Sequence, residues 1–253
     1  MKNFYRFFWI QIKEFDLKQI LLAFFLAFFS ILASPVFMQP NQPLSVLFLK
    51  SISGPELKGI RLVEIFQIIL LWTVVTANIM KKYSFYEQMK ELIVLRFKSI
   101  YTWTIVEAIS FMIYEILFLF LYILSVFLLS LLFCQEDLDL LPTGIIALKT
   151  FSGYFLSSIL LIVMIFVALL LSHSTQQTTA IIFLIFCLNA FSFQILGKCY
   201  YLLPGQIFYI GRIFKLTFEQ LRSLIIFTLS EISLLALFFG RILKKHDLYL
   251  IDE

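Results

Sequence analysis

Six long runs of apolar residues constrain this chain more than any other feature of its sequence. A bilayer core about 30 Å thick is crossed by about 20 residues of α-helix, and each run is about that long or longer. Composition agrees, because 61% of the 253 residues are hydrophobic, only 14% are charged and the mean hydropathy is +0.97. The sequence therefore predicts an all-α polytopic membrane protein. Its six transmembrane helices are expected at about residues 17–37, 60–79, 104–133, 148–171, 178–196 and 220–240, in one domain covering 1–253.

An amphipathic segment, residues 1–16, precedes the first run. Aromatic residues such as Phe8 and Trp9 alternate there with basic and polar ones, which is typical of a helix in the membrane interface. A slightly longer first transmembrane helix is the alternative, but the charged residues Lys13 and Glu14 interrupt the apolar run. Because the run itself is longer than the apolar part of a signal peptide, we expect a retained helix.

Basic residues predict the orientation of the chain. Lys and Arg are more numerous at the N-terminus, in the connection 80–103 and at the C-terminus than in the remaining connections. Since positive residues favour the cytoplasmic side, both termini are expected in the cytoplasm. The acidic connection 134–142 and the connection 197–220 then lie outside. In the latter, Pro204-Gly205 predicts a break and hence a short re-entrant or interfacial element. The net charge of +4 follows from topology and does not indicate nucleic-acid binding.

The connection between the second and third runs contains an amphipathic helical pattern. On a helix its apolar side chains form one stripe, and its charged and amide side chains form the other face. We expect this helix on the cytoplasmic surface, where it either meets a partner or only anchors the connection in lipid. The stripe contains Phe85, Tyr86, Met89, Leu92, Ile93, Phe97 and Ile100, and the polar face contains Glu87, Gln88, Lys90, Glu91 and Lys98.

Groups that could carry chemistry are few. No His lies in a span, no Gly-x-Ser-x-Gly elbow is present, and no metal-ligand spacing is found, so neither catalytic residues nor a bound metal are expected. Three carboxylates remain inside the spans. Because a carboxylate in a membrane is costly, each one is a candidate functional residue. Glu115 and Glu231 lie deep in the third and sixth spans, while Glu107 is near a span end, where reaching back to the surface is favoured.

The cysteines leave two interpretations open. Cys134 and Cys199 would both lie near the outer face, so a disulfide is one interpretation, and buried small apolar residues are the favoured one.

The order of elements, with Glu87 followed by "KELIVLRFKSIYTW", resembles the permease subunits of ABC-2-type ABC exporters. Among these it looks most like small permeases of lantibiotic and antimicrobial-peptide export and immunity systems of Gram-positive bacteria. The resemblance implies a bacterial plasma-membrane protein that forms a homodimer or a heterodimer with a related permease. It also implies an ATP-binding partner subunit that carries the ATP and Mg, since this chain has no Walker A sequence. A coupling helix at about 84–98 would dock on that partner through Phe85, Glu87, Met89, Glu91, Leu92, Arg96 and Lys98.

The expected function is therefore the membrane subunit of an ATP-driven exporter, with an amphipathic or antimicrobial peptide as substrate. Two alternatives differ in mechanism. One is an ion-coupled secondary transporter that uses Glu115 and Glu231 as proton sites, although inverted repeats are not evident in the sequence. The other is a membrane immunity protein that binds a toxin directly.

Overall fold

The computed structural model describes residues 16–37, 39, 42–52, 62–88, 100–134, 138–172, 174–191, 206–208 and 217–249, without side chains at 85–88, 100–103, 170, 206 and 243–249. Within these ranges the chain forms seven α-helices, one 3₁₀ helix and no strand. The elements are α2 (Leu17–Ala33), α3 (Leu44–Ile52), α4 (Leu62–Gln88), α6 (Ile100–Phe133), α7 (Leu140–Ser172), α8 (Thr175–Ala190), η2 (Gln206–Phe208) and α11 (Phe218–Tyr249).

Each of the six predicted apolar runs overlaps a helix of the described residues, namely α2, α4, α6, α7, α8 and α11, and the run 17–37 extends past the end of α2 at Ala33. Four of these helices are long and apolar enough to cross a membrane, over Leu62–Ser84, Thr104–Phe133, Leu140–Leu169 and Phe218–Ile242. The other two, α2 and α8, are apolar but shorter, with 17 and 16 residues. In its described residues the chain is therefore a helical protein with the character of a membrane-embedded one.

The start of α7 differs from the sequence prediction. The helix begins at Leu140, whereas the apolar run was expected to begin at about residue 148 and the acidic connection to extend to residue 142. Pro142 does not prevent this early start, because the first turn of a helix has no intrahelical partners for its N–H groups, and a proline there loses no hydrogen bond.

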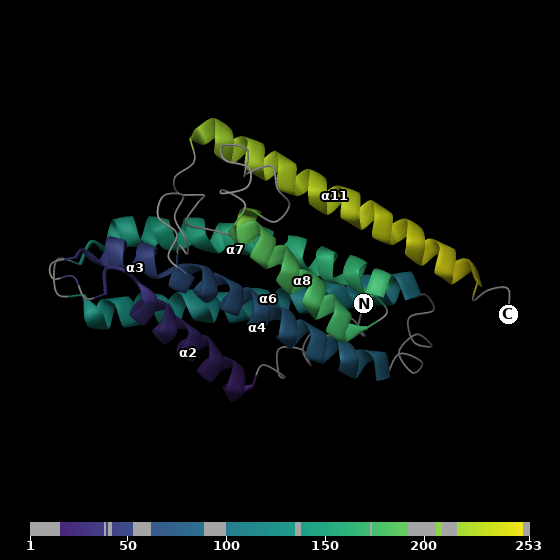
Figure 1. Ribbon diagram of the computed structural model, residues 1–253, viewed down its shortest axis with the longest axis horizontal. Coiled ribbons are helices and arrows are strands. Elements are labelled where there is room, and N and C mark those ends of the chain that lie inside the picture. The colour runs from purple at the N-terminus through teal and green to yellow at the C-terminus, as the bar shows by residue number, and fades with distance from the viewer. Residues whose placement is uncertain are drawn as a thin grey trace.

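The long helices form an elongated bundle in which chain neighbours run antiparallel (Figure 1). α2 packs along α6, α6 along α7, and α8 along both α7 and α4. α11 lies obliquely over one side of the bundle and contacts α7 and α6. The connections α2–α3 and α6–α7 lie at one end of the bundle. The C-terminal end of α4, the start of α6 and the α7–α8 turn lie at the other end (Figure 1).

Small residues allow α2 to approach α6 closely. Ala23, Ala27 and Ser30 are buried on one side of α2, and side chains of this size permit the short interhelical distances on which membrane bundles depend. The hydroxyl of Ser30 shares a hydrogen bond of 2.7 Å with that of Tyr122 on α6. Several larger side chains of α2, including Leu21 and Phe25, are exposed.

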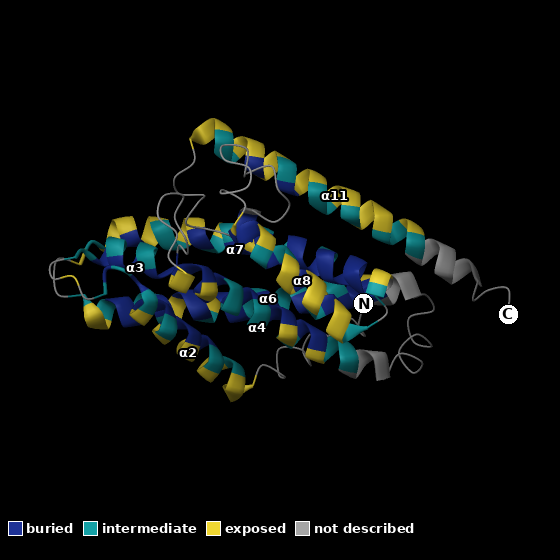
Figure 2. Ribbon diagram, viewed as in Figure 1, coloured by how far each residue is buried: buried dark blue, intermediate teal, exposed yellow. Residues whose placement is uncertain are grey.

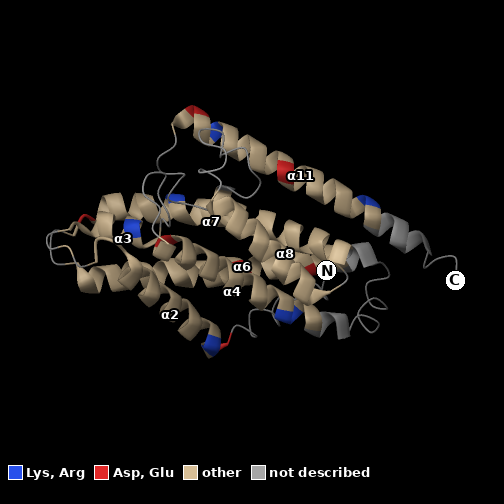
Figure 3. Ribbon diagram, viewed as in Figure 1, with Lys and Arg blue, Asp and Glu red and all other residues tan. Residues whose placement is uncertain are grey.

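Apolar side chains cover the outside of the bundle as well as its core. Figure 2 shows exposed residues along the outer faces of the helices, and Figure 3 shows that their middle parts carry few charged residues. α11 is the extreme case, because only 11% of its apolar window is buried, against 67% for α7. Such surfaces are unfavourable in water and suited to lipid.

Two short elements enter the bundle without crossing it. α3 has nine residues, too few to span a bilayer, yet one face of it is completely covered by α2, α6 and α7. The covered residues follow helical spacing: Leu44, Leu47, Phe48, Ser51 and Ile52. The second element, η2, lies in the connection between α8 and α11, and its Ile207 and Phe208 are buried against α7.

Candidate functional site

The residues predicted to form the coupling helix lie at one end of the bundle. Phe85 and Glu87 are in the last turns of α4, which continues as one helix from its apolar part to Gln88. The remaining predicted residues of this helix lie outside the described residues: Met89, Glu91, Leu92, Arg96 and Lys98. Nearby on α4, the ammonium group of Lys82 lies over the ring of Tyr114 on α6, 3.7 Å from its centroid, a cation–π contact that joins the two helices.

The α7–α8 turn, at the same end, is closed by hydrogen bonds of one hydroxyl group. The Ser172 hydroxyl is 2.8 Å from that of Thr178 and 3.2 Å from the Ser174 carbonyl oxygen. A turn this short keeps α7 and α8 antiparallel and adjacent.

Glu115, one of the two carboxylates predicted to lie deep in a span, is buried in α6 with 1% of its surface exposed. Neither of its carboxyl oxygens has a hydrogen-bond partner among the described residues, although both are shielded from solvent. The side chain that faces it is Ser158 on α7, whose hydroxyl donates to the carbonyl of Tyr154 at 2.9 Å. Glu115 is therefore an acidic group enclosed between two helices.

Glu231 and Glu107 have different surroundings. Glu231 is half-buried near the middle of α11 and interacts with other groups of the protein. Glu107 was expected to reach back to the membrane surface. This expectation is wrong, because the side chain is 4% exposed and also interacts inside the protein. The three carboxylates thus do not form one cluster in the described residues.

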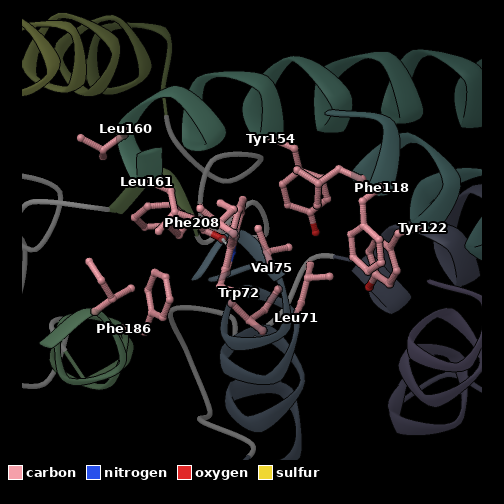
Figure 4. Close-up of a cluster of buried hydrophobic side chains, with 14 of the residues drawn as sticks. Leu71, Trp72, Val75, Phe118, Tyr122, Tyr154, Leu160, Leu161, Phe186 and Phe208 are labelled. Atoms are coloured by element: carbon pink, nitrogen blue, oxygen red, sulfur yellow. Dashed lines mark hydrogen bonds between the residues drawn. The ribbon is translucent and has the colours of Figure 1, made fainter. Parts of the chain in front are cut away.

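An aromatic cluster that the sequence analysis missed holds η2 inside the bundle (Figure 4). Trp72 lies near the middle of the α4 span and contacts Phe208, Tyr154 and Phe186, with ring centroids 4.8, 5.6 and 6.4 Å away. Its indole N–H donates to the carbonyl of Phe208 at 3.2 Å. The preceding carbonyl, that of Ile207, accepts from the Ser157 hydroxyl on α7 at 3.0 Å.

The C-terminal end of α3 is held in the same way. The last carbonyls of a helix have no intrahelical partner, so a helix that ends inside a membrane protein needs other donors. The side-chain amide of Gln67 on α4 donates to the carbonyl of Ser51, and the hydroxyl of Tyr154 on α7 donates to that of Ile52 at 3.5 Å. Tyr154 thus contacts both short elements, because its ring also packs on Trp72.

Asp139 connects the N-terminal ends of α3 and α7. Its carboxylate accepts the backbone N–H of Ser45 at 2.9 Å and also the Ser45 hydroxyl, while its backbone carbonyl accepts the Thr143 hydroxyl at 2.8 Å. Partial burial raises the pKa of Asp139, but the hydrogen bonds from Ser45 and Thr143 outweigh it, and the pKa lies below its ordinary value.

Cys134 lies at this end as well. Its thiol donates to the carbonyl of Gln42 across 3.7 Å. Cys199, the other member of the disulfide considered from the sequence, lies outside the described residues.

These observations define the class of protein. It is a helical membrane protein whose interior holds two short elements, α3 and η2, through backbone carbonyls paired with buried side chains. Comparison with protein-family models, curated proteins and solved structures gives no match.

Proposed function

We propose that this chain is the transmembrane subunit of an ATP-driven exporter, with ATP hydrolysed by a separate subunit. In this proposal α2, α4, α6, α7, α8 and α11 all cross the bacterial plasma membrane and both termini are cytoplasmic. α2 and α8, although short, reach the interfacial region at their polar ends and tolerate the mismatch by local thinning of the bilayer.

One observation carries the proposal. α4 continues as a helix beyond its apolar part to Gln88, directly into the segment that resembles a coupling helix. The connection from Gln88 to Ile100 starts and ends at the same end of the bundle as the α7–α8 turn (Figure 1). A partner subunit at that end would reach both connections at once, and a push on residues 89–99 would move α4 and α6 together.

The proposed substrate is an amphipathic peptide. The chain has 31 Phe residues, and exposed aromatic side chains such as Phe25 and Phe66 offer apolar contact surface along the bundle. Packing and lipid contact use the same side chains, so the substrate assignment rests mainly on the resemblance to peptide-export permeases. A second permease, identical or related, would complete the transporter.

The proposal is tested by purification of the tagged full chain from its native host in mild detergent. Mass spectrometry identifies the proteins that accompany it, and vanadate-sensitive ATP hydrolysis is measured in the same sample. We expect an ATP-binding chain to copurify with the wild type. Replacement of both Glu87 and Glu91 by Lys should lower the amount of copurified ATP-binding chain, and the ATP hydrolysis, at least tenfold. The reason is that both carboxylates would face the partner.

The matched control is Glu219→Lys, which reverses one exposed carboxylate in the first turn of α11, away from the end of the bundle where α4 ends and α6 begins (Figure 1). This variant should keep the ATP-binding chain. A wild-type preparation without any ATP-binding chain contradicts the proposal. If peptide transport into vesicles then follows a proton gradient without ATP, the chain is an ion-coupled transporter, and if toxin binding persists without any partner, it is an immunity protein.

A further inference from the structure

Glu115 is the most unusual titratable group in the described part of the chain. It is 1% exposed, both carboxyl oxygens are buried, and neither has a hydrogen-bond partner within the ranges that the structure describes. A carboxylate in such surroundings loses the hydration that stabilises its charge and gains nothing in return, whereas the neutral acid avoids most of that cost. The alternative, a compensating positive charge, requires a Lys or Arg within reach.

No described Lys or Arg pairs with Glu115. The helices packed against α6 are α2, α3, α4, α7 and α11, and their described basic residues lie towards their ends (Figure 3). None of the charged or titratable side chains on these helices makes a hydrogen bond or ion pair with Glu115; they are Lys18, Lys50, Glu64, Lys81, Lys82, Tyr83, Lys149, Tyr154, Glu219, Arg222, Glu231 and Arg241. On α6 itself, Tyr114, Tyr122 and Glu107 do not pair with it either.

The neighbour on the facing helix is a hydroxyl group. Ser158 lies on α7 opposite Glu115, and its hydrogen is directed to the Tyr154 carbonyl. A serine oxygen in this state can accept a hydrogen bond but has no second hydrogen to give. It can therefore serve a protonated carboxyl as an acceptor, whereas it can donate to a carboxylate only by giving up its bond to the Tyr154 carbonyl.

We propose that Glu115 is a proton-binding site enclosed between α6 and α7, occupied in this conformation and emptied only when the two helices separate enough to admit water. On release, the O–H bond of the carboxylic acid breaks, its electron pair stays on the carboxylate, and the proton passes to an entering water molecule. Proton release is thereby linked to opening between α6 and α7, and alkaline pH favours the open arrangement. This inference does not depend on an ATPase partner.

Infrared spectroscopy of the full chain in lipid nanodiscs at neutral pH tests the proposal. The difference between wild type and Glu115→Gln should show the loss of one carbonyl stretch of a neutral carboxylic acid. The matched control, Glu219→Gln, changes an exposed carboxylate and should remove carboxylate stretches only. Loss of carboxylate stretches in Glu115→Gln would overturn the proposal.

A second variant and an isotope-exchange measurement test the same proposal independently. If Glu115→Gln does not fold, Glu115→Asp retains the acid, and the neutral carbonyl stretch should then shift in frequency without disappearing; no shift would contradict the assignment. Transfer of the wild type to D₂O tests enclosure. A slow shift of the same band is expected, and an immediate shift would show that water already reaches Glu115. Both results are independent of whether any ATP-binding chain copurifies.

Discussion

Single side chains in this bundle satisfy backbone groups that no helix can satisfy. Trp72 and Ser157 donate to the carbonyls of η2, while Gln67 and Tyr154 donate to those at the end of α3. In a bilayer there is no water to replace such donors, so each one makes an interruption of helical structure tolerable at depth. These four residues therefore determine where α3 and η2 can lie inside the bundle.

Asp139 satisfies backbone and side-chain donors at a helix start, whereas the four residues above satisfy carbonyl acceptors. Its carboxylate accepts N–H and O–H groups of Ser45 in the first turn of α3, where the helix dipole also favours a negative charge. It precedes α7 as well, so one residue fixes the starts of two helices. Asp16 also precedes a helix, α2, but makes no side-chain hydrogen bond to it.

A pH-dependent loss of stability is expected from Asp139. Since its pKa is lowered in the folded chain, its contribution is fully present above the ordinary Asp value of about 3.9 and is lost as pH falls through the lower folded value. Asp139→Asn should cost about 0.3–1 kcal/mol at neutral pH and abolish this acid dependence. Unfolding in detergent, followed by circular dichroism at several pH values, measures both effects. Asp16→Asn is the comparison variant and should cost less, because Asp16 makes no side-chain hydrogen bond to its helix. An unchanged acid dependence in Asp139→Asn would assign it to another group.

At the scale of elements, the long helices could be predicted from the sequence and the short ones only in part. η2 lies in the connection 197–220, where Pro204-Gly205 predicted a short element, whereas α3 was not predicted. A run such as 104–133 is continuously apolar, so length alone identifies it, and the structure has a helix at Ile100–Phe133. α3 was missed because turn residues surround it, although Leu44, Leu47, Phe48 and Ile52 have helical spacing that could have indicated it.

The candidate site was predictable only in part, for a related reason. A lone Glu in an apolar run is conspicuous, so Glu115 was found from sequence. Trp72, Gln67 and Ser157 were not, because each looks like an ordinary residue of its helix until a carbonyl from a distant segment lies beside it. Such pairings depend on how α3 and η2 enter the bundle, and no local pattern specifies that.

Removal of the Ser157 hydroxyl measures how much the hydrogen bond between α7 and η2 contributes to stability. The Ser157 hydroxyl lies within hydrogen-bond distance of two carbonyls, that of Gly153 in its own helix at 2.8 Å and that of Ile207 at 3.0 Å. Ser152 on the same helix donates only to Leu148, within the helix itself. Ser157→Ala leaves a buried carbonyl without this donor and should lower the free energy of unfolding by about 1–2 kcal/mol. Ser152→Ala is the matched control and should have almost no effect. Equal stabilities in SDS-induced unfolding would show that Trp72 alone holds η2.

At the scale of the whole molecule, the apolar exterior and the two ends of the bundle belong together. Apolar residues cover the middle of the bundle, and the connections gather at its two ends (Figures 1 and 2). The α7 span has 30 residues, which corresponds to about 45 Å of helix and exceeds a hydrocarbon core of about 30 Å. The connections before and after α7 should therefore emerge on opposite sides of the membrane.

Cysteine accessibility tests this topology and the orientation predicted from the basic residues. In a chain with Cys134, Cys187 and Cys199 replaced by Ser, one cysteine is introduced at Leu138, which is 58% exposed, or at Ser174 in the α7–α8 turn. A membrane-impermeant maleimide should label Leu138→Cys in intact cells and Ser174→Cys only after permeabilisation, because the basic ends face the cytoplasm. The reverse pattern would mean an inverted chain, with any coupling segment outside and no access to ATP. Labelling of both positions in intact cells would mean that α7 does not cross the membrane.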